Sequence, residues 1–316
     1  MPKITVAIVT YKRAWSLPYC LDSLTKQTRR PDEVLVVLKP SGDGSEEVIR
    51  KFSDELPIRL MVQREGNFTD AVAMAYRNAE GELILYIDDD AIAHPEFVER
   101  YEALFRKLDK AGGITGLGYT ALMDGQLKLI NETQRSTYTT IGRRRKFLAS
   151  LSKLHRKPLP EYADYCEWLS TSGLLGGICS SDAALSAGLW GANMGLKTEL
   201  IVDCPLDKLY KRSKRGFHNE QILSYCIRRK GYHTYRVLNP DIAPIVWHIQ
   251  HRSLSRDPGF WGEFWIHYDR VANYWRLREL GARVSFAAYL FALIVLLRRK
   301  TLPRLLATLT FPFTGL

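Results

Sequence analysis

The sequence contains few cysteines, and their spacing argues against a zinc site and against a disulfide framework. Only five occur in 316 residues, and no two are spaced as Cys-x-x-Cys. A zinc site or a dense disulfide framework is therefore not expected. We expect most of the five to be buried thiols that pack as small core residues. They are Cys20, Cys166, Cys179, Cys204 and Cys226.

The start of the sequence shows no secretory signal. After Lys3, the run Ile4–Val9 has the length and composition of a buried strand, and it does not resemble the apolar region of a signal peptide. We therefore expect the N-terminal domain to lie in the cytoplasm.

Long apolar runs are scarce, and the two at the C-terminus fall short of a secure transmembrane helix. A full span needs about 20 apolar residues. Val284–Leu297 has 14 uncharged residues, and Thr301–Leu316 is broken by prolines and an arginine. The basic triplet Arg298-Arg299-Lys300 separates the two. We expect a re-entrant or interfacial hairpin or a short tilted span; a buried helix of a soluble domain is the alternative.

The composition excludes a disordered chain, and basic residues outnumber acidic ones. Apolar residues make up 46% of the sequence, which is ample for a core. The formal net charge is +11. Such a charge favours an anionic partner, namely nucleic acid, anionic lipid or a phosphorylated substrate. A basic solvated surface without a partner is the alternative.

Part of the positive charge is concentrated in residues 142–158. The basic residues of this segment are interleaved with Phe147, Leu148, Leu151 and Leu154 at helical spacing. This pattern is typical of a basic amphipathic helix on a membrane surface. A solvated helix that covers part of the core is the alternative.

The first third of the chain alternates strand-like and helix-like segments. Such alternation predicts helical crossovers and a mainly parallel α/β sheet. Ligands bind beyond the carboxyl ends of the strands in such a sheet. The loops Thr10–Arg13, Lys39–Gly44 and Asp88–Asp90 should therefore meet at one edge. The predicted strands are Ile4–Val9, Glu33–Leu38, Ile58–Val62 and Leu83–Ile87, and the predicted helices are Leu17–Gln27, Glu46–Asp54, Thr69–Ala79 and Pro95–Leu108.

Three consecutive carboxylates, Asp88, Asp89 and Asp90, follow the fourth predicted strand. They repel one another, and burial would raise their pKa values unless cations compensate. A hard divalent ion supplies that compensation and also bridges substrate phosphates. In extended backbone Asp88 and Asp90 point to one face and Asp89 to the other. The triplet therefore predicts a metal site; an acidic loop in which Asp90 caps the next helix is the alternative.

Four segments follow one another in a recognisable order. They are the opening Val6–Arg13 with Leu21–Leu24 and Gln27-Thr28, the region Asn78–Ala91 around the acidic triplet, the segment Gly191–Met194, and Asn219–Ser224 with Arg228 and Gly231-Tyr232. In this order they resemble the opening, the DxD region, the acceptor-side segment and the base segment of family 2 glycosyltransferases, from about residue 4 to 250. The resemblance implies an α/β fold of the GT-A nucleotide-diphospho-sugar transferase type over residues 1–250, with a C-terminal membrane-associated helical region at residues 251–316.

The resemblance assigns the donor side to residues near the first and fourth strands. Thr10, Tyr11 and Arg13 would line the nucleotide, and Tyr11 would offer its ring to the base. Asp88 would hold the ribose or the metal, and Asp89 would touch the sugar. The family usually has aspartates for base recognition directly after the second strand, and this chain lacks them there. The nucleobase is therefore left open.

The resemblance also implies a metal ion, Mg²⁺ or Mn²⁺, and further groups around the donor. Asp88, Asp90 and the late His248 would hold the ion. Asp70 would also contact the donor, and Arg252 would neutralise the leaving diphosphate.

The segment of the catalytic base departs from the family pattern. The usual Glu-Asp pair reads Glu220-Gln221 here, and a glutamine cannot accept a proton at working pH. Glu220 is then the predicted base, with Asp203 and Asp207 in reserve. A salt bridge from Glu220 to Arg215 or Arg228 is the structural alternative.

These features predict an inverting glycosyltransferase at a membrane. The C-terminal part is similar to the dolichyl-phosphate-using and cellulose-synthase-like branches. It implies a lipid-linked glycan acceptor on a polyprenyl or dolichyl (pyro)phosphate, contact with membrane lipid, and a catalytic domain on the cytoplasmic side of the cell membrane. GDP-mannose is the first expected donor and a UDP-hexose the second. Trp190 and Asn193 would lie on the acceptor side, and the aromatic residues 260–265 suit the headgroup boundary.

Three other classes are weighed against this prediction. A basic nucleic-acid-binding protein would explain the charge, but no recognised motif supports it, and we expect no nucleic acid partner. A nucleotidyltransferase would need a glycine loop at the first turn, where the sequence reads Thr10-Tyr11-Lys12-Arg13. An inactive scaffold is the third alternative, which the glutamine in the base motif keeps open.

Overall fold

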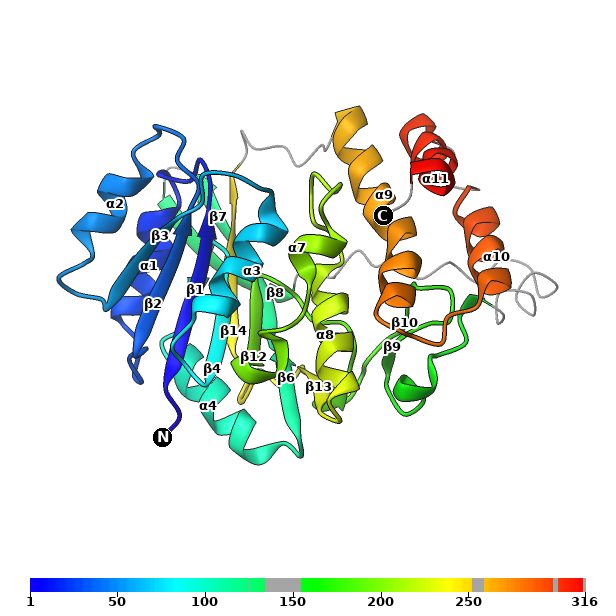
Figure 1. The fold of residues 1–316 in the computed structure, drawn as a ribbon. Coiled ribbons are helices and arrows are strands. Elements are labelled where there is room, and N and C mark those ends of the chain that lie inside the picture. The colour runs from blue at the N-terminus through cyan, green and yellow to red at the C-terminus, as the bar shows by residue number, and fades with distance from the viewer. Residues whose placement is uncertain (125, 134–154, 252–258, 298–300, 315–316) are drawn as a thin grey trace.

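The computed structural model describes residues 1–124, 126–133, 155–251, 259–297 and 301–314. Its centre is an eight-stranded mixed sheet in the order β11-β13-β6-β12-β4-β1-β2-β3 (Figure 1). Parallel pairing joins β4, β1, β2 and β3, so the predicted parallel arrangement of the first four strands is confirmed. The strands are β1 (Ile4–Thr10), β2 (Glu33–Leu38), β3 (Ile58–Val62), β4 (Leu83–Ile87), β6 (Ala111–Thr115), β11 (Ala183–Leu185), β12 (Asn193–Lys197) and β13 (His233–Val237).

Helices cover both faces of this sheet, which explains why its central strands are apolar on both sides. In β1, Val6 and Ile8 pack into one cluster, whereas Ala7 between them packs into the other. The helices of the first cluster are α1 (Leu17–Thr25), α2 (Ser45–Lys51) and α4 (Phe97–Lys107), and those of the second are α3 (Phe68–Asn78), α6 (Thr198–Ile201), α7 (Leu206–Leu209) and α8 (Asn219–Arg229).

A second, four-stranded sheet brings the segment that ends near residue 250 back to the first half of the chain. Its order is β5-β14-β7-β8. β14 pairs with β5 so that His248 lies opposite Ala91, the residue directly after the acidic triplet. A late histidine is thereby placed next to the end of β4. The strands are β5 (Ala91–Ala93), β7 (Leu117–Asp124), β8 (Gln126–Thr133) and β14 (Ile245–His251).

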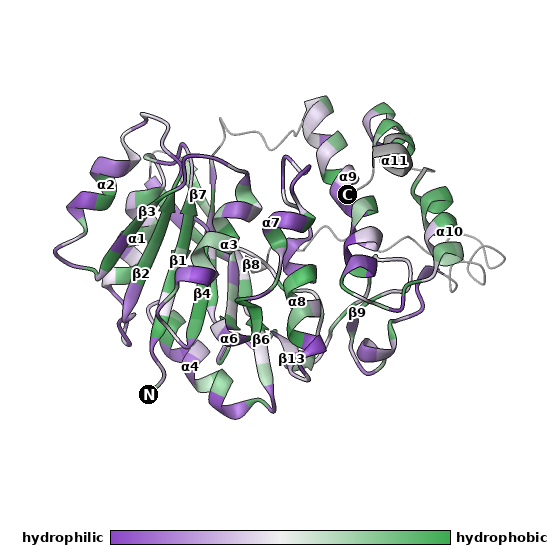
Figure 2. Ribbon diagram, viewed as in Figure 1, coloured by the Kyte–Doolittle hydropathy of each residue, from purple (hydrophilic) through white to green (hydrophobic). Residues whose placement is uncertain are grey.

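Three helices at the C-terminus, α9 (Gly259–Glu279), α10 (Phe286–Leu297) and α11 (Leu302–Thr314), form a cluster of their own beside α8 (Figure 1). Figure 2 shows α10 mostly in the green of hydrophobic residues. Among the helices that the structure describes, none combines the length and apolar character needed to cross a bilayer. The predicted basic amphipathic helix at residues 142–158 lies almost wholly outside the described residues.

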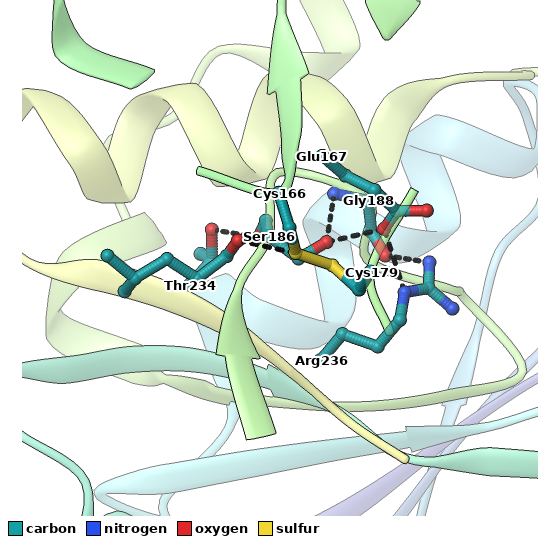
Figure 3. Close-up of a disulfide and its surroundings, with 8 residues drawn as sticks. Cys166, Glu167, Cys179, Ser186, Gly188, Thr234 and Arg236 are labelled. Atoms are coloured by element: carbon teal, nitrogen blue, oxygen red, sulfur yellow. Dashed lines mark hydrogen bonds and ion pairs between the residues drawn. A yellow bond between two sulfur atoms is a disulfide. The ribbon is translucent and has the colours of Figure 1, made fainter. Parts of the chain in front are cut away.

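The prediction that most cysteines are thiols is wrong. Cys166 is bonded to Cys179 and Cys204 to Cys226, and only Cys20 is a buried free thiol. The first bridge ties the hairpin of β9 (Glu167–Leu169) and β10 (Leu175–Gly177) together (Figure 3). The spacings of 13 and 22 residues match no sequence motif. The second bridge joins the segment after α6 to α8, which meet only when the chain is packed. A short 3-10 helix, Pro160–Tyr162, precedes this hairpin.

Candidate active site

The acidic triplet lies in the turn between β4 and β5, and two of its members approach His248. The imidazole Nε2 is 2.9 Å from Asp90 Oδ1 and 3.5 Å from Asp88 Oδ2. One potential ligand atom from each of the three residues lies within 4.8 Å of the others. The structure thus brings together the three residues predicted from the sequence as metal ligands.

This group of residues fits a divalent metal ion. Carboxylate oxygens are preferred by Mg²⁺ and Mn²⁺, and imidazole is accepted by first-row transition metals. Burial lowers the pKa of His248, but hydrogen bonds and charges from Asp88 and Asp90 outweigh it and raise this pKa to about 9. The charged ring therefore compensates the two carboxylates. A bound cation would take over that role, so the donor set suits a metal centre.

Asp89 faces a different partner, the guanidinium of Arg13. Arg13 Nε lies 3.3 Å from Asp89 Oδ1, and Arg13 Nη2 lies 3.8 Å from Asp90 Oδ2. Burial and repulsion from Asp90 raise the pKa of Asp89 to about 7, although Arg13 opposes that shift. Arg13 therefore offsets part of the charge of the triplet from the end of β1.

Tyr11 is the accessible member of the predicted nucleotide-lining residues. Its side chain is 48% exposed, whereas Thr10 is buried. Lys12 Nζ and Lys39 Nζ lie 5.2 Å and 6.0 Å from the centre of the Tyr11 ring. An aromatic face flanked by two ammonium groups can attract both a nucleobase and its phosphates. The contribution of Lys39 follows from its place at the end of β2, and the sequence prediction assigned it no role.

Glu220 lies in the first turn of α8, close to Gly191. The backbone N–H of Gly191 donates to its carboxylate, and a Cβ at Gly191 would come 2.8 Å from Glu220 Oε1. Burial raises the pKa of Glu220 to about 7, and the charge of Asp88 adds to this shift. Arg228 donates instead to the carbonyl of Glu161. A carboxylate with a pKa near neutrality suits a general base.

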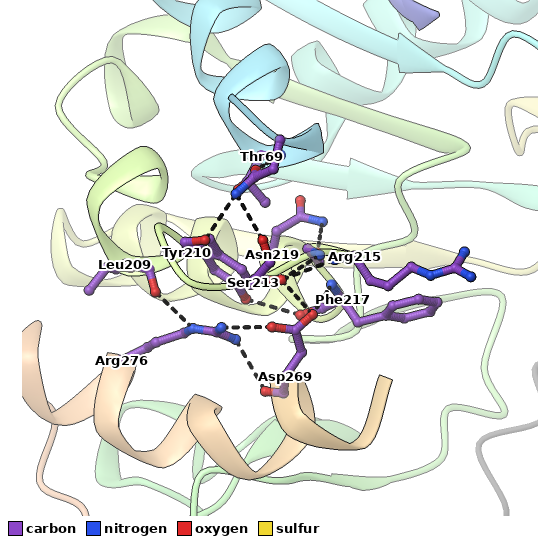
Figure 4. Close-up of polar contacts among 11 residues, drawn as sticks. Thr69, Leu209, Tyr210, Ser213, Arg215, Phe217, Asn219, Asp269 and Arg276 are labelled. Atoms are coloured by element: carbon purple, nitrogen blue, oxygen red, sulfur yellow. Dashed lines mark hydrogen bonds and ion pairs between the residues drawn. The ribbon is translucent and has the colours of Figure 1, made fainter. Parts of the chain in front are cut away.

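A buried polar network holds the segment that leads into α8 (Figure 4). Arg276 Nη2 on α9 lies 2.7 Å from Asp269 Oδ1, and both side chains are almost fully buried. Asp269 Oδ2 also accepts from Ser213 Oγ and from the backbone N–H of Phe217. On the other side, the Asn67 amide donates to the carbonyl of Ser213. The C-terminal helix α9 and the start of α3 therefore fix the loop that ends at Glu220.

Of the two residues predicted on the acceptor side, the structure corrects the role of Asn193. Asn193 has no exposed surface. Its Nδ2 donates to the carbonyls of Leu117 and Pro244, and its Oδ1 accepts from Tyr101. The side chain therefore joins strands and cannot contact an acceptor, which corrects the prediction. Trp190 is partly buried, and its ring packs over Gly118 of β7.

Three predicted acidic residues take part in local structure. Asp70 accepts from the backbone N–H of Asn67 at 2.6 Å and completes the capping box of α3. Asp203 pairs with Lys230 and Asp207 with Arg77. These contacts give each carboxylate a structural role, so neither reserve base is needed. The predicted diphosphate contact Arg252 lies outside the described residues.

Residues 5–154 match the model of a family described as Glycosyl transferase family 2. This part of the chain belongs to that family. Over 105 residues it is 31% identical to the glycosyltransferase AglE of Haloferax volcanii, covering 32% of this chain and 34% of that protein. Over 103 residues it is 30% identical to a validoxylamine A glucosyltransferase of Streptomyces hygroscopicus, covering 31% and 23% of the two chains. The match spans about a third or less of these relatives.

Solved structures show that the family 2 domain has the GT-A fold. GalNAc-T7 with UDP, GalNAc and Mn²⁺ superimposes with a TM-score of 0.59 at 13% identity, covering 86% of this chain and 48% of that one. The mannosyltransferase PcManGT from Pyrobaculum calidifontis, in complex with GDP-Man and Mn²⁺, superimposes with a TM-score of 0.51 at 17% identity, covering 97% and 79%. At identities this low, the structural likeness establishes the fold alone. The predicted α/β GT-A architecture is confirmed.

Proposed function

We propose that the protein is an inverting, metal-dependent glycosyltransferase that uses a nucleotide-sugar donor. The observation that carries this proposal is the convergence of Asp88, Asp90 and His248 at one sheet edge, with Glu220 coupled electrostatically to Asp88. Metal ligands and a carboxylate with a raised pKa are what a transfer from a diphosphate leaving group needs. The Mn²⁺ in the two related folds supports a divalent ion, Mg²⁺ or Mn²⁺.

In the proposed reaction Glu220 accepts the proton of the acceptor hydroxyl. The hydroxyl oxygen forms a bond to the anomeric carbon as the bond from that carbon to the diphosphate oxygen breaks. The electron pair leaves with the nucleoside diphosphate, so the anomeric configuration inverts. A divalent ion held by Asp88, Asp90 and His248 would neutralise charge on that leaving group. Tyr11 would stack on the nucleobase.

The donor is proposed to be GDP-mannose, with a UDP-hexose as the second candidate. A mannosyltransferase with GDP-Man and a glucosyltransferase both stand among the related proteins, so they support each candidate. Calorimetric titration of GDP-mannose and UDP-glucose, with and without Mn²⁺, would test the choice on wild type and Asp90→Ala. Metal-dependent binding of one donor, lost in the variant, is expected. Absence of binding to any sugar nucleotide would contradict the proposal and favour a scaffold.

The acceptor is proposed to be a lipid-linked glycan at a membrane surface. The exposed apolar side chains of the C-terminal helices support this proposal, because they recur at helical spacing on one face of α10 and one face of α11. Trp261 near the start of α9 is 66% exposed and suits a headgroup boundary. The exposed residues are Phe286, Leu290 and Ile294 on α10, and Leu302, Leu305, Leu306 and Leu309 on α11.

Binding to vesicles would test the membrane proposal. Sedimentation with anionic vesicles should bring down the wild-type protein, and Leu290→Glu with Ile294→Glu should weaken this association. A control pair of substitutions, Glu46→Lys and Lys51→Glu on the remote helix α2, should leave it unchanged. Equal sedimentation of both double variants would contradict a membrane role for α10.

The catalytic domain is proposed to face the cytoplasm, and the cysteines offer a direct test. Disulfides are rare in a reducing cytoplasm. The structure bridges these four cysteines, and on this proposal a reducing cytoplasm would hold both bridges open as thiols. We therefore expect Cys166, Cys179, Cys204 and Cys226 to be labelled by a thiol reagent after denaturation of protein taken from cells under acid quench. Full protection of all four against labelling would instead place the domain in an oxidising compartment.

A further inference from the structure

A cavity of about 170 Å³ lies between the β9–β10 hairpin, the start of α8, and the helices α9 and α10. One water molecule occupies about 30 Å³ in the liquid, so the cavity has the size of a small ligand group. Gln221 lines it, whereas the neighbouring Glu220 contacts Gly191. The first turn of α8 therefore connects this cavity to the proposed catalytic base.

A chain of hydrogen bonds along the wall of the cavity fixes the orientation of three polar side chains. The Asn273 amide donates from Nδ2 to the carbonyl of Gly173 at 2.8 Å, and also to Gln221 Oε1 at 3.0 Å. Gln221 Nε2 must then be the donor to His218 Nδ1, at 2.9 Å. Because a neutral imidazole carries one proton, that proton lies on Nε2 of His218. The carbonyl of Gly173 thus determines the tautomer of the histidine.

This chain ends in one donor and one acceptor without a partner. His218 Nε2 and Asn273 Oδ1 are both buried and make no hydrogen bond within the described part of the protein. The two residues are 9% and 1% exposed, and both line the cavity. Buried polar atoms are rarely left unpaired in a folded protein, so these two need an explanation. Each lacks what a hydroxyl group supplies, since a hydroxyl both accepts and donates.

The backbone conformation of His218 also indicates that this series of hydrogen bonds serves a ligand site. His218 has a φ of 66°, a conformation that is uncommon for a residue other than glycine. Strained positions of this kind concentrate at ligand sites, because surrounding contacts must hold them. Here the holding contacts come from Gln221 and from the Asp269–Arg276 network below the same loop.

The polar part of the cavity is mostly uncharged. Burial lowers the pKa of His218 to about 3 and that of His155 to about 4, so both rings are neutral near pH 7. Glu167 is paired with Arg236 at 2.8 Å, as Figure 3 shows. Arg156 and Arg270 also border the cavity. The interior groups therefore suit a neutral hydroxylated ligand more than an anion.

The opposite wall is apolar. It includes Leu174 and Leu175 of the hairpin together with Val295 and Leu296 of α10. The outer face of that same helix carries the exposed Leu290 and Ile294. A ligand with a hydroxylated ring and an aliphatic extension would therefore contact matching groups on both walls.

We infer that this cavity binds a sugar ring of the acceptor, with ring hydroxyls bonded to His218 Nε2 and Asn273 Oδ1. This inference rests on the proposed transferase function and adds a binding site to it. The ring could belong to a soluble glycan or to the head of a glycolipid, which share the chemistry that the polar wall recognises. His218, Gln221 and Asn273 act here in binding and positioning, and the proton transfer is left to Glu220.

The test is the binding of methyl and n-octyl glycosides of glucose and mannose to the full chain, followed by calorimetry or ligand-observed NMR. His218→Asn removes the Nε2 donor with a side chain that tolerates the left-handed backbone. We expect about tenfold weaker glycoside binding, the loss of one hydrogen bond, with unchanged donor binding. His233→Asn, a histidine on β13, is the matched control and should bind as wild type.

A second variant protects the test against misfolding. Gln221→Met keeps the size of the side chain but breaks the hydrogen-bond chain, so it should also weaken glycoside binding while thermal melting stays cooperative. Tighter binding of octyl than methyl glycosides would identify a glycolipid head, and equal binding would identify a soluble glycan. Glycoside binding that is unaffected by either variant would overturn the inference, as would no glycoside binding at all. Donor binding measured in parallel tests the transferase proposal separately.

Discussion

The two sides of the first turn of α8 differ in the kind of polar group that they present. On the sheet-edge side, the carboxyl groups of Asp88, Asp89 and Asp90 face the basic side chains of Arg13 and His248. On the cavity side, two neutral amides and the neutral imidazole of His218 form the part of the wall nearest the turn, with Arg156 and Arg270 at its border. Charged groups suit a metal ion and a diphosphate, whereas neutral donors and acceptors suit hydroxyl groups. One short segment therefore separates two chemically different binding regions.

The support that both sides share is the buried pair of Arg276 and Asp269, and its loss should have the largest effect. Arg276→Met leaves the Asp269 carboxylate buried without its partner, which should cost about 3–5 kcal/mol of unfolding free energy. Chemical denaturation would measure the change. The matched control is Arg77→Met, which removes a half-exposed pair with Asp207 and should cost less than about 1 kcal/mol. Similar losses in the two variants would contradict the role of the network.

Removal of the proposed base should slow the transfer reaction without changing ligand binding in the cavity. Glu220→Gln keeps the shape of the side chain but cannot accept a proton, so kcat should fall by about 10²–10⁴-fold. Donor binding and glycoside binding should stay as in wild type. Asp203→Asn, at a reserve base that pairs with Lys230, is the control and should keep full activity. Loss of donor binding in Glu220→Gln would remove Glu220 from the role of base.

Removing one charge from the proposed metal ligands should weaken metal binding at the sheet edge and leave the cavity unaffected. Asp90→Asn retains hydrogen bonding to His248 but lowers the charge of the donor set. Mn²⁺ affinity should therefore fall by about 10–100-fold, as measured by calorimetry. Methyl glycoside binding should be unchanged, because the cavity holds none of these ligands. Asp70→Asn, at the capping box of α3, should leave Mn²⁺ affinity unaltered.

The two regions should also differ in their dependence on pH, with the smallest effects of the series. Burial raises the pKa of Glu220 to about 7, and a base must be deprotonated to act. Below that pH kcat/KM should rise about tenfold per pH unit, and above it the rate should level off. Glycoside binding should stay constant between about pH 5 and 8, since burial lowers the pKa of His218 to about 3. A parallel pH profile for both measurements would contradict the division.

The sequence predicted the sheet edge well because its signals are local. Each strand is a short apolar run of its own, and polar residues follow it directly, as at Tyr11–Arg13 after β1 and Asp88 after β4. The parallel order then places these ends together. Even the late His248 could be proposed, although its contact with Asp90 requires the pairing of β14 with β5.

Other predictions depended on contacts between distant segments, and the sequence could not decide them. Asn193 looks like a surface polar residue, yet it is fully buried and bonded to a helix, a strand and a loop from three parts of the chain. The four bridged cysteines show no sequence motif, and the partners Cys204 and Cys226 meet only when the segment after α6 packs on α8. Asn273 bonds to Gln221 and Gly173, which lie 52 and 100 residues away in the sequence. Gln221 in turn bonds to His218.

By itself, the sequence determined an α/β domain with an acidic triplet at the carboxyl edge of its sheet, since periodicity and strand-end position are properties of neighbouring residues. Only the tertiary structure decided which side chains are exposed, which cysteines are bridged and where a hydroxyl could bind. Burial and the completion of hydrogen bonds depend on atoms that arrive from elsewhere in the chain. The histidine tautomer beside the base is set by a carbonyl 45 residues away, and no local pattern could carry that information.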